Sequence, residues 1–194
     1  MTPIGPSKYQ DISRFRLPAG FRGRSAAVTQ LWWIVQATLF HPSPQVCYGW
    51  RRFLLRLFGA EIGCRVLIRP SVRVTYPWRL RIGDHSWIGD HVELYTLDRI
   101  DVGRNSVVSQ GTYLCTGTHD HRLATFDMLT APIVVEDEAW VAAQCFIGPG
   151  VTVGSGSVVG ARSLVLENVP AGKIVAGHPA AIRGDRPRSG GQGV

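Results

Sequence analysis

Aliphatic residues recur at every sixth position along most of the chain. Glycine directly follows several of them, as in Ile147-Gly148, Val153-Gly154 and Val159-Gly160. Earlier in the chain the same phrase comes in triplets, and the step between triplets is eight residues instead of six. The positions in register are Ile62, Ile68, Val74, Ile82, Ile88, Leu94, Val102, Val108, Leu114, Val135, Val141, Ile147, Val153, Val159 and Val165.

This period fits neither a flat sheet nor an amphipathic helix. A half-buried strand alternates every two residues, and a helix repeats about every 3.6. A six-residue period grouped in threes predicts an all-β fold, a parallel β-helix in which three short strands form each coil. The aliphatic residue should point inward onto the next coil. Glycine or a small polar residue should occupy the corner, where a positive φ is often required.

One long interruption breaks this register. Leu114 and Val135 are 21 residues apart where six are expected, so the sequence predicts a protruding loop over residues 117–132. The segment gathers two histidines, two aspartates and an arginine, and loops on a rigid scaffold often carry function. The five residues are His119, Asp120, His121, Arg122 and Asp127.

The chain before the repeats predicts two helices, at residues 25–40 and 46–58. Ser25 can cap the first, and the proline-rich run 41–44 separates the two. With the irregular residues 1–24, these helices form a predicted cap over residues 1–60. The β-helix domain is predicted at 61–183, and the Gly-, Arg-, Pro- and Ser-rich residues 184–194 at the end are predicted to be a flexible tail.

The amino-acid composition indicates the class of protein but does not identify its ligand. The 194 residues, 45% of them hydrophobic, suit one globular domain and exclude a disordered or collagen-like chain. A net charge of +7, almost wholly arginine, favours anionic partners such as phosphate esters, nucleic acid or acidic membrane surfaces. Four scattered cysteines without a CxxC pair, and a polar N-terminus unlike a signal peptide, lead us to expect a cytoplasmic protein.

Several phrases together resemble the hexapeptide-repeat O-acetyltransferases, in the branch associated with colanic-acid-type exopolysaccharide synthesis. The resemblance covers about residues 25–183. The phrases that carry it are Leu31-Trp32-Trp33, Gly49-Trp50-Arg51-Arg52, Tyr76-Pro77-Trp78, Leu114-Cys115-Thr116-Gly117-Thr118-His119-Asp120, Pro132-Ile133-Val134-Val135, Ala139-Trp140-Val141 and Val175-Ala176-Gly177-His178-Pro179-Ala180.

The resemblance implies a left-handed β-helix, a homotrimer with active sites in clefts between subunits, acetyl-CoA as donor and a saccharide as acceptor. It implies neither a metal nor a nucleic-acid partner. It also implies that His119 is the general base, which suits the chemistry because a sugar hydroxyl must lose its proton as it attacks the thioester. The backbone at Ala142-Ala143 is the candidate oxyanion donor.

Other site residues follow from the same resemblance. Glu93 and Asp98, one coil below the loop, and Asp120 could orient His119 or bind the acceptor. Where family members carry basic residues toward CoA, this chain has Glu167 and Ala181, so the phosphate contacts are expected to shift to Arg162, Lys173, Arg183 or Arg186, with Arg183 best placed. The donor site is therefore predicted at Trp140, Ala142, Ala143, Gly160, Ala161, Arg162, Pro179 and Arg183.

Two other functions stay open at this point. A zinc hydratase of the γ-carbonic-anhydrase type shares the β-helix and holds zinc with three histidines, but the spacing of His119 and His121 does not reproduce its ligand pattern. A non-catalytic β-helix could serve as an assembly protein, although the loop histidine argues against it. An acyl donor larger than acetyl is also compatible with the sequence.

The two helices allow two interpretations. Trp32, Trp33 and Trp50, with Arg51, Arg52 and Arg56 beside an apolar face, are typical of an interfacial helix, which would make the protein peripheral at the inner face of the membrane. Alternatively, the helices pack over the open end of the β-helix and cover its unpaired edge. The apolar run from residue 31 to 40 is too short to span a bilayer.

Overall fold

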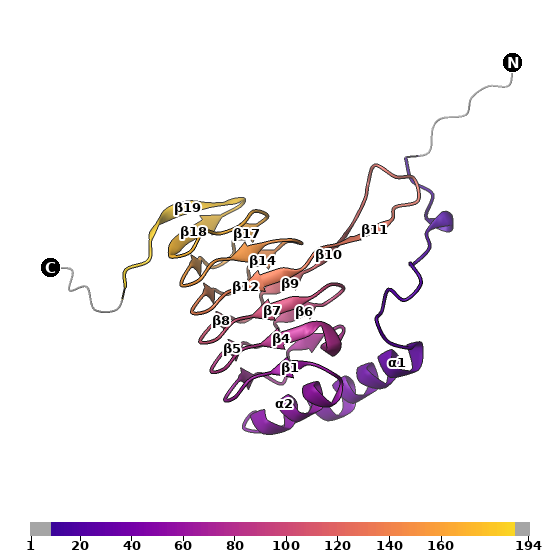
Figure 1. Cartoon of the computed structure of the whole chain (residues 1–194), viewed down its shortest axis with the longest axis horizontal. Helices are drawn as coiled ribbons and strands as arrows, with labels where there is room; N and C mark the ends of the chain where they lie inside the picture. Colours follow the sequence, from indigo (N-terminus) through magenta and orange to yellow (C-terminus); the bar gives the residue numbers. More distant parts are fainter. Residues whose placement is uncertain (1–8, 189–194) are drawn as a thin grey trace, which may run out of the picture.

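The computed structural model describes residues 9–188, which form a parallel β-helix with a helical cap at one end (Figure 1). Three parallel sheets make its sides. The first contains β1 (Glu61–Ile62), β4 (Leu80–Ile82), β7 (Ile100–Val102), β12 (Ile133–Val135) and β15 (Thr152–Val153). The second contains β2 (Leu67–Ile68), β5 (Trp87–Ile88), β8 (Val107–Val108), β13 (Trp140–Val141), β16 (Val158–Val159), β18 (Lys173–Gly177) and β19 (Ala180–Asp185). The third contains β3 (Arg73–Val74), β6 (Glu93–Tyr95), β9 (Tyr113–Cys115), β14 (Phe146–Ile147) and β17 (Leu164–Val165).

The predicted register is confirmed. In the first sheet Ile62 pairs with Ile82, Ile82 with Val102, Val102 with Val135 and Val135 with Val153. Every one of the fifteen aliphatic positions is buried, and all but Ile62 are at most 2% exposed. One aliphatic column therefore runs inside each sheet, and burial of these columns is the main favourable term in folding.

At the corners, close packing against the next coil and a positive φ are provided by different residues, although the sequence predicts glycine or a small polar residue there. At Gly83 an added Cβ would lie 2.7 Å from the backbone nitrogen of Arg104 on the next coil, so this glycine allows close stacking. The positive φ falls two residues later and on residues other than glycine, such as His85 at 61° and Asn105 at 54°. His85 and His91, which has φ 55°, are thus corner residues.

The two predicted helices cap the first coil. α1 (Ala26–Val35) begins at Ser25, whose hydroxyl accepts the Val28 N–H at 3.3 Å, and continues as the π-helical turn η2 (Gln36–Phe40). α2 (Tyr48–Leu57) lies beside it. Short 3-10 turns η1 (Ile12–Arg14) and η3 (Pro77–Arg79) complete the helical elements of the described residues.

Side chains of the cap donate to the open edge of the first coil. The guanidinium of Arg51 donates to Ile68 O at 2.6 Å, Arg52 donates to Val66 O at 2.8 Å, and Arg56 to Ile62 O. On the third sheet the indole N–H of Trp32 donates to Val74 O at 2.8 Å. Capping of the open end is therefore confirmed, and these arginines point toward the β-helix.

The fully buried Arg51 has only neutral acceptors. Besides Ile68 O, its guanidinium donates to the Ser43 hydroxyl and to the carbonyls of Pro44 and Gln45. Burial lowers the pKa of this guanidinium. Arginine suits the position because its planar fork can satisfy several carbonyls at once.

The C-terminal end differs from the prediction in its boundary. β18 turns back into antiparallel β19, which extends to Asp185, and Lys173 pairs with Asp185 at 2.5 Å. The Arg186 N–H bonds to Gly172 O, so a tail starting at residue 184 is wrong for residues 184–186. Pairing of β19 with β18 holds Gly184 and Asp185 in the sheet. Residues 189–194 of the predicted tail, and residues 1–8 of the predicted cap, lie outside the described part of the chain.

The predicted loop over residues 117–132 is largely a β-hairpin. β10 (Gly117–His119) pairs antiparallel with β11 (Met128–Thr130) and projects away from the β-helix (Figure 1). It leaves after β9 of the third sheet and returns into β12 of the first, so it emerges at the edge where these two sheets meet.

Replacement of Val153 by lysine should prevent stable folding. Val153 is fully buried inside the coil, and an unpaired buried charge costs about 3–5 kcal/mol. Ser155→Lys is the matched control, since Ser155 is exposed and bonds to the carboxylate of Glu136. Thermal unfolding followed by circular dichroism measures both. A normally stable Val153→Lys protein would contradict the assigned register.

Arg51→Met should lower the free energy of unfolding by about 2–4 kcal/mol, because buried carbonyls lose a charged donor. Arg56→Met removes a comparable set of bonds, but its side chain is exposed, so water can replace it and the loss should stay below about 1 kcal/mol. Urea denaturation compares the two variants. Equal losses would show that burial of the guanidinium is not what makes Arg51 important.

Candidate active site

His119 is fixed in place by the hairpin that carries it. Its Nδ1 lies 2.8 Å from the carbonyl oxygen of Phe126, and its ring stacks on the Phe126 ring with centroids 4.2 Å apart. A carbonyl only accepts hydrogen bonds, so Nδ1 carries the proton in the neutral ring. Nε2 is then left with its lone pair, which is the form a general base requires.

Phe126 holds an unusual backbone conformation to make this contact. Its φ is 54°, in the left-handed region that aromatic residues rarely adopt. Its N–H bonds to Leu123 O, which closes the tight turn. Backbone strain of this kind clusters at functional sites. Phe126 was not among the sequence candidates, because nothing in the local pattern marks it as a partner of His119.

The N-terminal segment also reaches the hairpin. The Asp11 N–H donates to Ala124 O at 2.7 Å, and the Phe15 ring meets His119 edge-on with centroids 5.8 Å apart. Figure 1 shows this segment running from beside the hairpin down to α1. His119 therefore lies between two aromatic rings, one from its own hairpin and one from a segment about a hundred residues earlier.

Asp120 serves the hairpin itself. Its carboxylate accepts the Arg122 side chain through two bonds, at 2.8 and 2.7 Å, and the Arg122 backbone N–H at 3.0 Å. These bonds lower the pKa of Asp120 to about 2. The carboxylate thus stays charged and held by Arg122 at neutral pH, and a role in acceptor binding remains a prediction.

Glu93 and Asp98 lie below the hairpin as expected, but in two different hollows. The Asp98 backbone N–H donates to the Thr116 hydroxyl at 2.9 Å, which places it under the root of the hairpin, near Phe21 and Arg79. Glu93 pairs in register with Tyr113 and lines a hollow with Trp33. Among the described residues, neither forms a hydrogen bond with His119.

The predicted donor residues come together at another edge. The turns after β13, β16 and β18 stack where the second and third sheets meet. The Arg162 N–H donates to Ala143 O, an added Cβ on Gly160 would lie 2.9 Å from that of Ala176, and Arg183 donates to Ala176 O. The stack contains Ala142, Ala143, Gly160, Ala161, Arg162, Ala176, Gly177 and Arg183, with Pro179 in the turn that leads to β19.

The structure distinguishes between the two candidate oxyanion donors. The Ala142 N–H bonds to Val159 O at 2.9 Å as part of the coil ladder, which removes it as a donor. In the described part of the chain, the Ala143 N–H has no acceptor. Of these two residues, Ala143 is therefore the one that keeps an N–H for a ligand.

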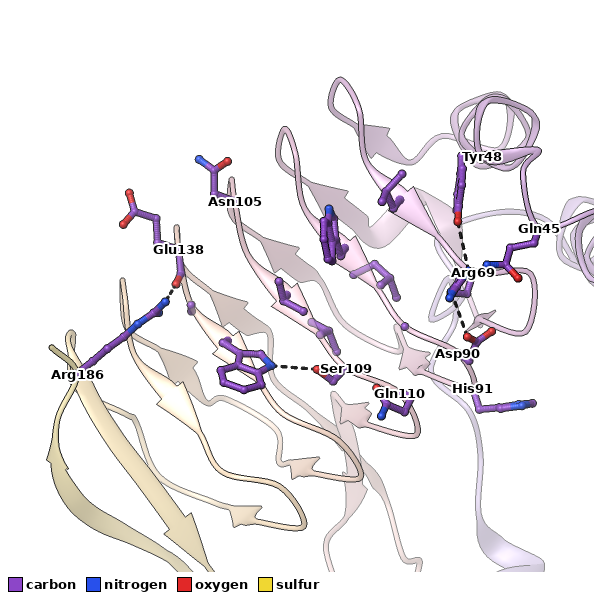
Figure 2. Close-up of a pocket in the computed structure, with 18 residues that line it drawn as sticks. Gln45, Tyr48, Arg69, Asp90, His91, Asn105, Ser109, Gln110, Glu138 and Arg186 are labelled. Atoms are coloured by element: carbon purple, nitrogen blue, oxygen red, sulfur yellow. Dashed lines mark hydrogen bonds and ion pairs between the residues drawn. The ribbon is translucent and has the colours of Figure 1, made fainter. Parts of the chain in front are cut away.

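The outer face of the second sheet carries a groove of about 1020 Å³ (Figure 2). Trp140 is one of the residues that line it. Its indole N–H donates to the Ser109 hydroxyl at 3.0 Å, and Trp87 lines the same groove two coils away. Arg186 closes one end by donating to Glu138 O. Trp87 was missed, although it precedes an inward aliphatic residue just as Trp140 does.

Within one chain, His119 and the donor turns lie at different edges of the β-helix. The hairpin leaves where the third and first sheets meet, whereas the turns lie where the second and third meet, so the third sheet separates them. A single chain therefore presents the base and the donor turns apart. Within residues 9–188, no group of three His, Cys, Asp or Glu side chains could hold a metal ion.

Comparison with known proteins gives a consistent result, although no family model matches the chain. The colanic acid biosynthesis acetyltransferase WcaF of Escherichia coli is 55% identical over 177 residues, covering 91% of this chain and 97% of its own length. Galactoside O-acetyltransferase of the same organism is 26% identical over 135 residues, covering 68% of this chain and 66% of its own.

A solved structure agrees in fold and sequence. The hexapeptide-repeat acetyltransferase VCA0836 of Vibrio cholerae, in complex with acetyl coenzyme A, superposes with a TM-score of 0.76 at 27% identity, covering 86% of this chain and 92% of that one. The repeat register, the hairpin and these relatives together establish that the chain is an acetyltransferase and belongs to the hexapeptide-repeat family that includes WcaF.

Proposed function

We propose that this acetyltransferase moves the acetyl group of acetyl-CoA to a hydroxyl of a saccharide used in exopolysaccharide synthesis, with His119 as general base. The observation that carries the proposal is the hydrogen bond from Nδ1 of His119 to Phe126 O, because it leaves Nε2 as an acceptor. The WcaF relative is named for colanic acid biosynthesis, which supports a polysaccharide setting. The galactoside O-acetyltransferase relative supports a sugar oxygen as the acceptor atom.

The proposed reaction is a direct transfer. The acceptor hydroxyl oxygen attacks the thioester carbonyl while Nε2 of His119 takes its proton. The oxyanion that forms is stabilised by the N–H of Ala143, which has no acceptor in the described part of the chain. The C–S bond then breaks, and the CoA thiolate takes the proton back from the imidazolium.

A rigid base favours this reaction. Stacking on Phe126 and the edge contact with Phe15 restrict the ring, and the Asp120–Arg122 pair stiffens the turn beyond it. A base that is already oriented spends little free energy on ordering in the transition state.

We further propose that the complete site forms between two copies of the chain. The separation of the hairpin from the donor turns by the third sheet supports this, since the projecting hairpin of one copy could reach the donor edge of the next. A ring of three such copies would hold three equivalent sites, which is consistent with the homotrimer implied by the family resemblance.

His119→Gln should lower kcat by about 100-fold or more, the usual effect of losing a general base. Thermal stability and acetyl-CoA binding should change little. His121→Gln is the matched control, because His121 is an exposed imidazole in the same hairpin. Acetyl transfer to saccharide acceptors is followed by release of free thiol. Full activity of His119→Gln would refute the assignment of the base.

Mixing two inactive variants tests the shared site. Ala161→Trp should block the donor turn, while His119→Gln removes the base from the hairpin. If each site uses one hairpin and the neighbour's donor turn, refolded equal mixtures should recover about a quarter of the wild-type activity. Each variant refolded alone is the control. No recovery, with mixed oligomers demonstrated by mass spectrometry, would place both groups of a site in one chain.

A further inference from the structure

Positive charge is concentrated in the N-terminal third of the chain. Residues 12–60 contain seven arginines and no acidic residue, so they account for the whole net charge of +7. The basic and acidic residues of the rest of the chain balance one another. Two of the seven, Arg14 and Arg16, lie on the segment beside the hairpin. The other five belong to the capped end: Arg22, Arg24, Arg51, Arg52 and Arg56. The carbonyl acceptors of the capping arginines Arg51, Arg52 and Arg56 are neutral, so they do not cancel the positive charge of the guanidinium groups.

The outer face of the same cap is apolar and exposed. Residues 26–40, which form α1 and η2, contain no charged side chain. With about 100° between successive helix residues, Ile34 lies opposite Trp32, which packs on the β-helix, and Phe53 lies opposite Arg51. The outer apolar residues are between 41% and 66% exposed: Leu31, Ile34, Leu39, Trp50, Phe53 and Leu57.

These residues form one surface across both helices. The Trp50 indole donates to Leu39 O at 3.0 Å, which ties α2 to η2, and the Trp50 and Phe53 rings stack with centroids 5.7 Å apart. The two helices lie side by side across the end of the β-helix (Figure 1). The side chains that cap the β-helix lie on the inner faces of α1 and α2, so capping does not explain why the outer faces are apolar.

We propose that this end of the molecule docks on an anionic lipid surface, with the outer faces of α1 and α2 in the interface. Charge complementarity favours this partner, because an exposed apolar face that includes Trp50 and Phe53, on a cap whose residues 22–60 carry five arginines and no acidic residue, matches acyl chains under anionic headgroups. No helix in residues 9–188 is long and apolar enough to cross a membrane, so the helices lie along the surface. The proposal does not depend on the acceptor of the acetyl group.

The test is sedimentation of the full chain with vesicles of phosphatidylcholine alone or mixed equally with phosphatidylglycerol. We expect retention by the anionic vesicles at low salt and little by the neutral ones. Raising KCl to about 1 M, where the Debye length falls to about 3 Å, should weaken retention strongly. No retention by anionic vesicles at low salt, or equal retention by both kinds, would overturn the proposal.

Paired variants test the apolar face itself. Phe53→Ser with Leu57→Ser should weaken binding to anionic vesicles by at least about tenfold. Leu31→Gln with Ile34→Gln is a second pair on the other helix, should the first not fold. The matched control is Leu166→Ser with Ile182→Ser, since these are 57% and 56% exposed near the opposite end of the β-helix. Retention of both outer-face variants at the wild-type level would overturn the proposal.

Light scattering addresses the other possible occupant, a second copy of the chain. The wild-type and outer-face variants should have the same mass in solution, as expected for a face reserved for lipid. A larger wild-type mass that falls in the variants would show that this face joins copies of the chain, and would overturn lipid docking.

Discussion

Hydrogen bonding between successive coils is the interaction on which the rest of the structure depends. Each short strand completes its backbone bonds only with the coils on either side, so all coils must keep the same path and extra residues can leave only at the edges. The hairpin obeys this constraint: it departs after β9 and the chain re-enters β12 with Val135 directly over Val102. The location of His119 is therefore a consequence of how the coils are joined.

The same dependence on neighbouring coils creates a need at the first coil, which has no coil beneath it. Arginines and tryptophans from two helices supply donors to its carbonyls. The buried Arg51 joins one of these, Ile68 O, to the carbonyls of Pro44 and Gln45 in the connection between the helices. The inner faces of the helices bind the first coil, and their outer faces remain apolar and exposed. The end of the molecule that the fold must cover is thus also the end with an exposed apolar surface and an excess of positive charge.

At the hairpin, long-range contacts turn a protruding segment into a defined site. The Phe126 carbonyl selects the tautomer of His119, and rings from both sides limit its motion. The donor turns are held by bonds between coils, such as that from Arg162 N–H to Ala143 O, but they stack on a different edge because the period of the coils places them there.

The sequence by itself determined the β-helix, its inward residues and the position of the interruption, since a repeat of six is a local pattern that each coil enforces on the next. His119 and the donor turns came from motif resemblance; the repeat alone does not mark them. The extent of β19, the pairing of the hairpin, the contact of Phe15 with His119 and the direction of Arg51, Arg52 and Arg56 were decided by the tertiary structure. Each of these features is a contact between segments that come together only in the folded chain. The local periodicity of the sequence carries no information about such contacts.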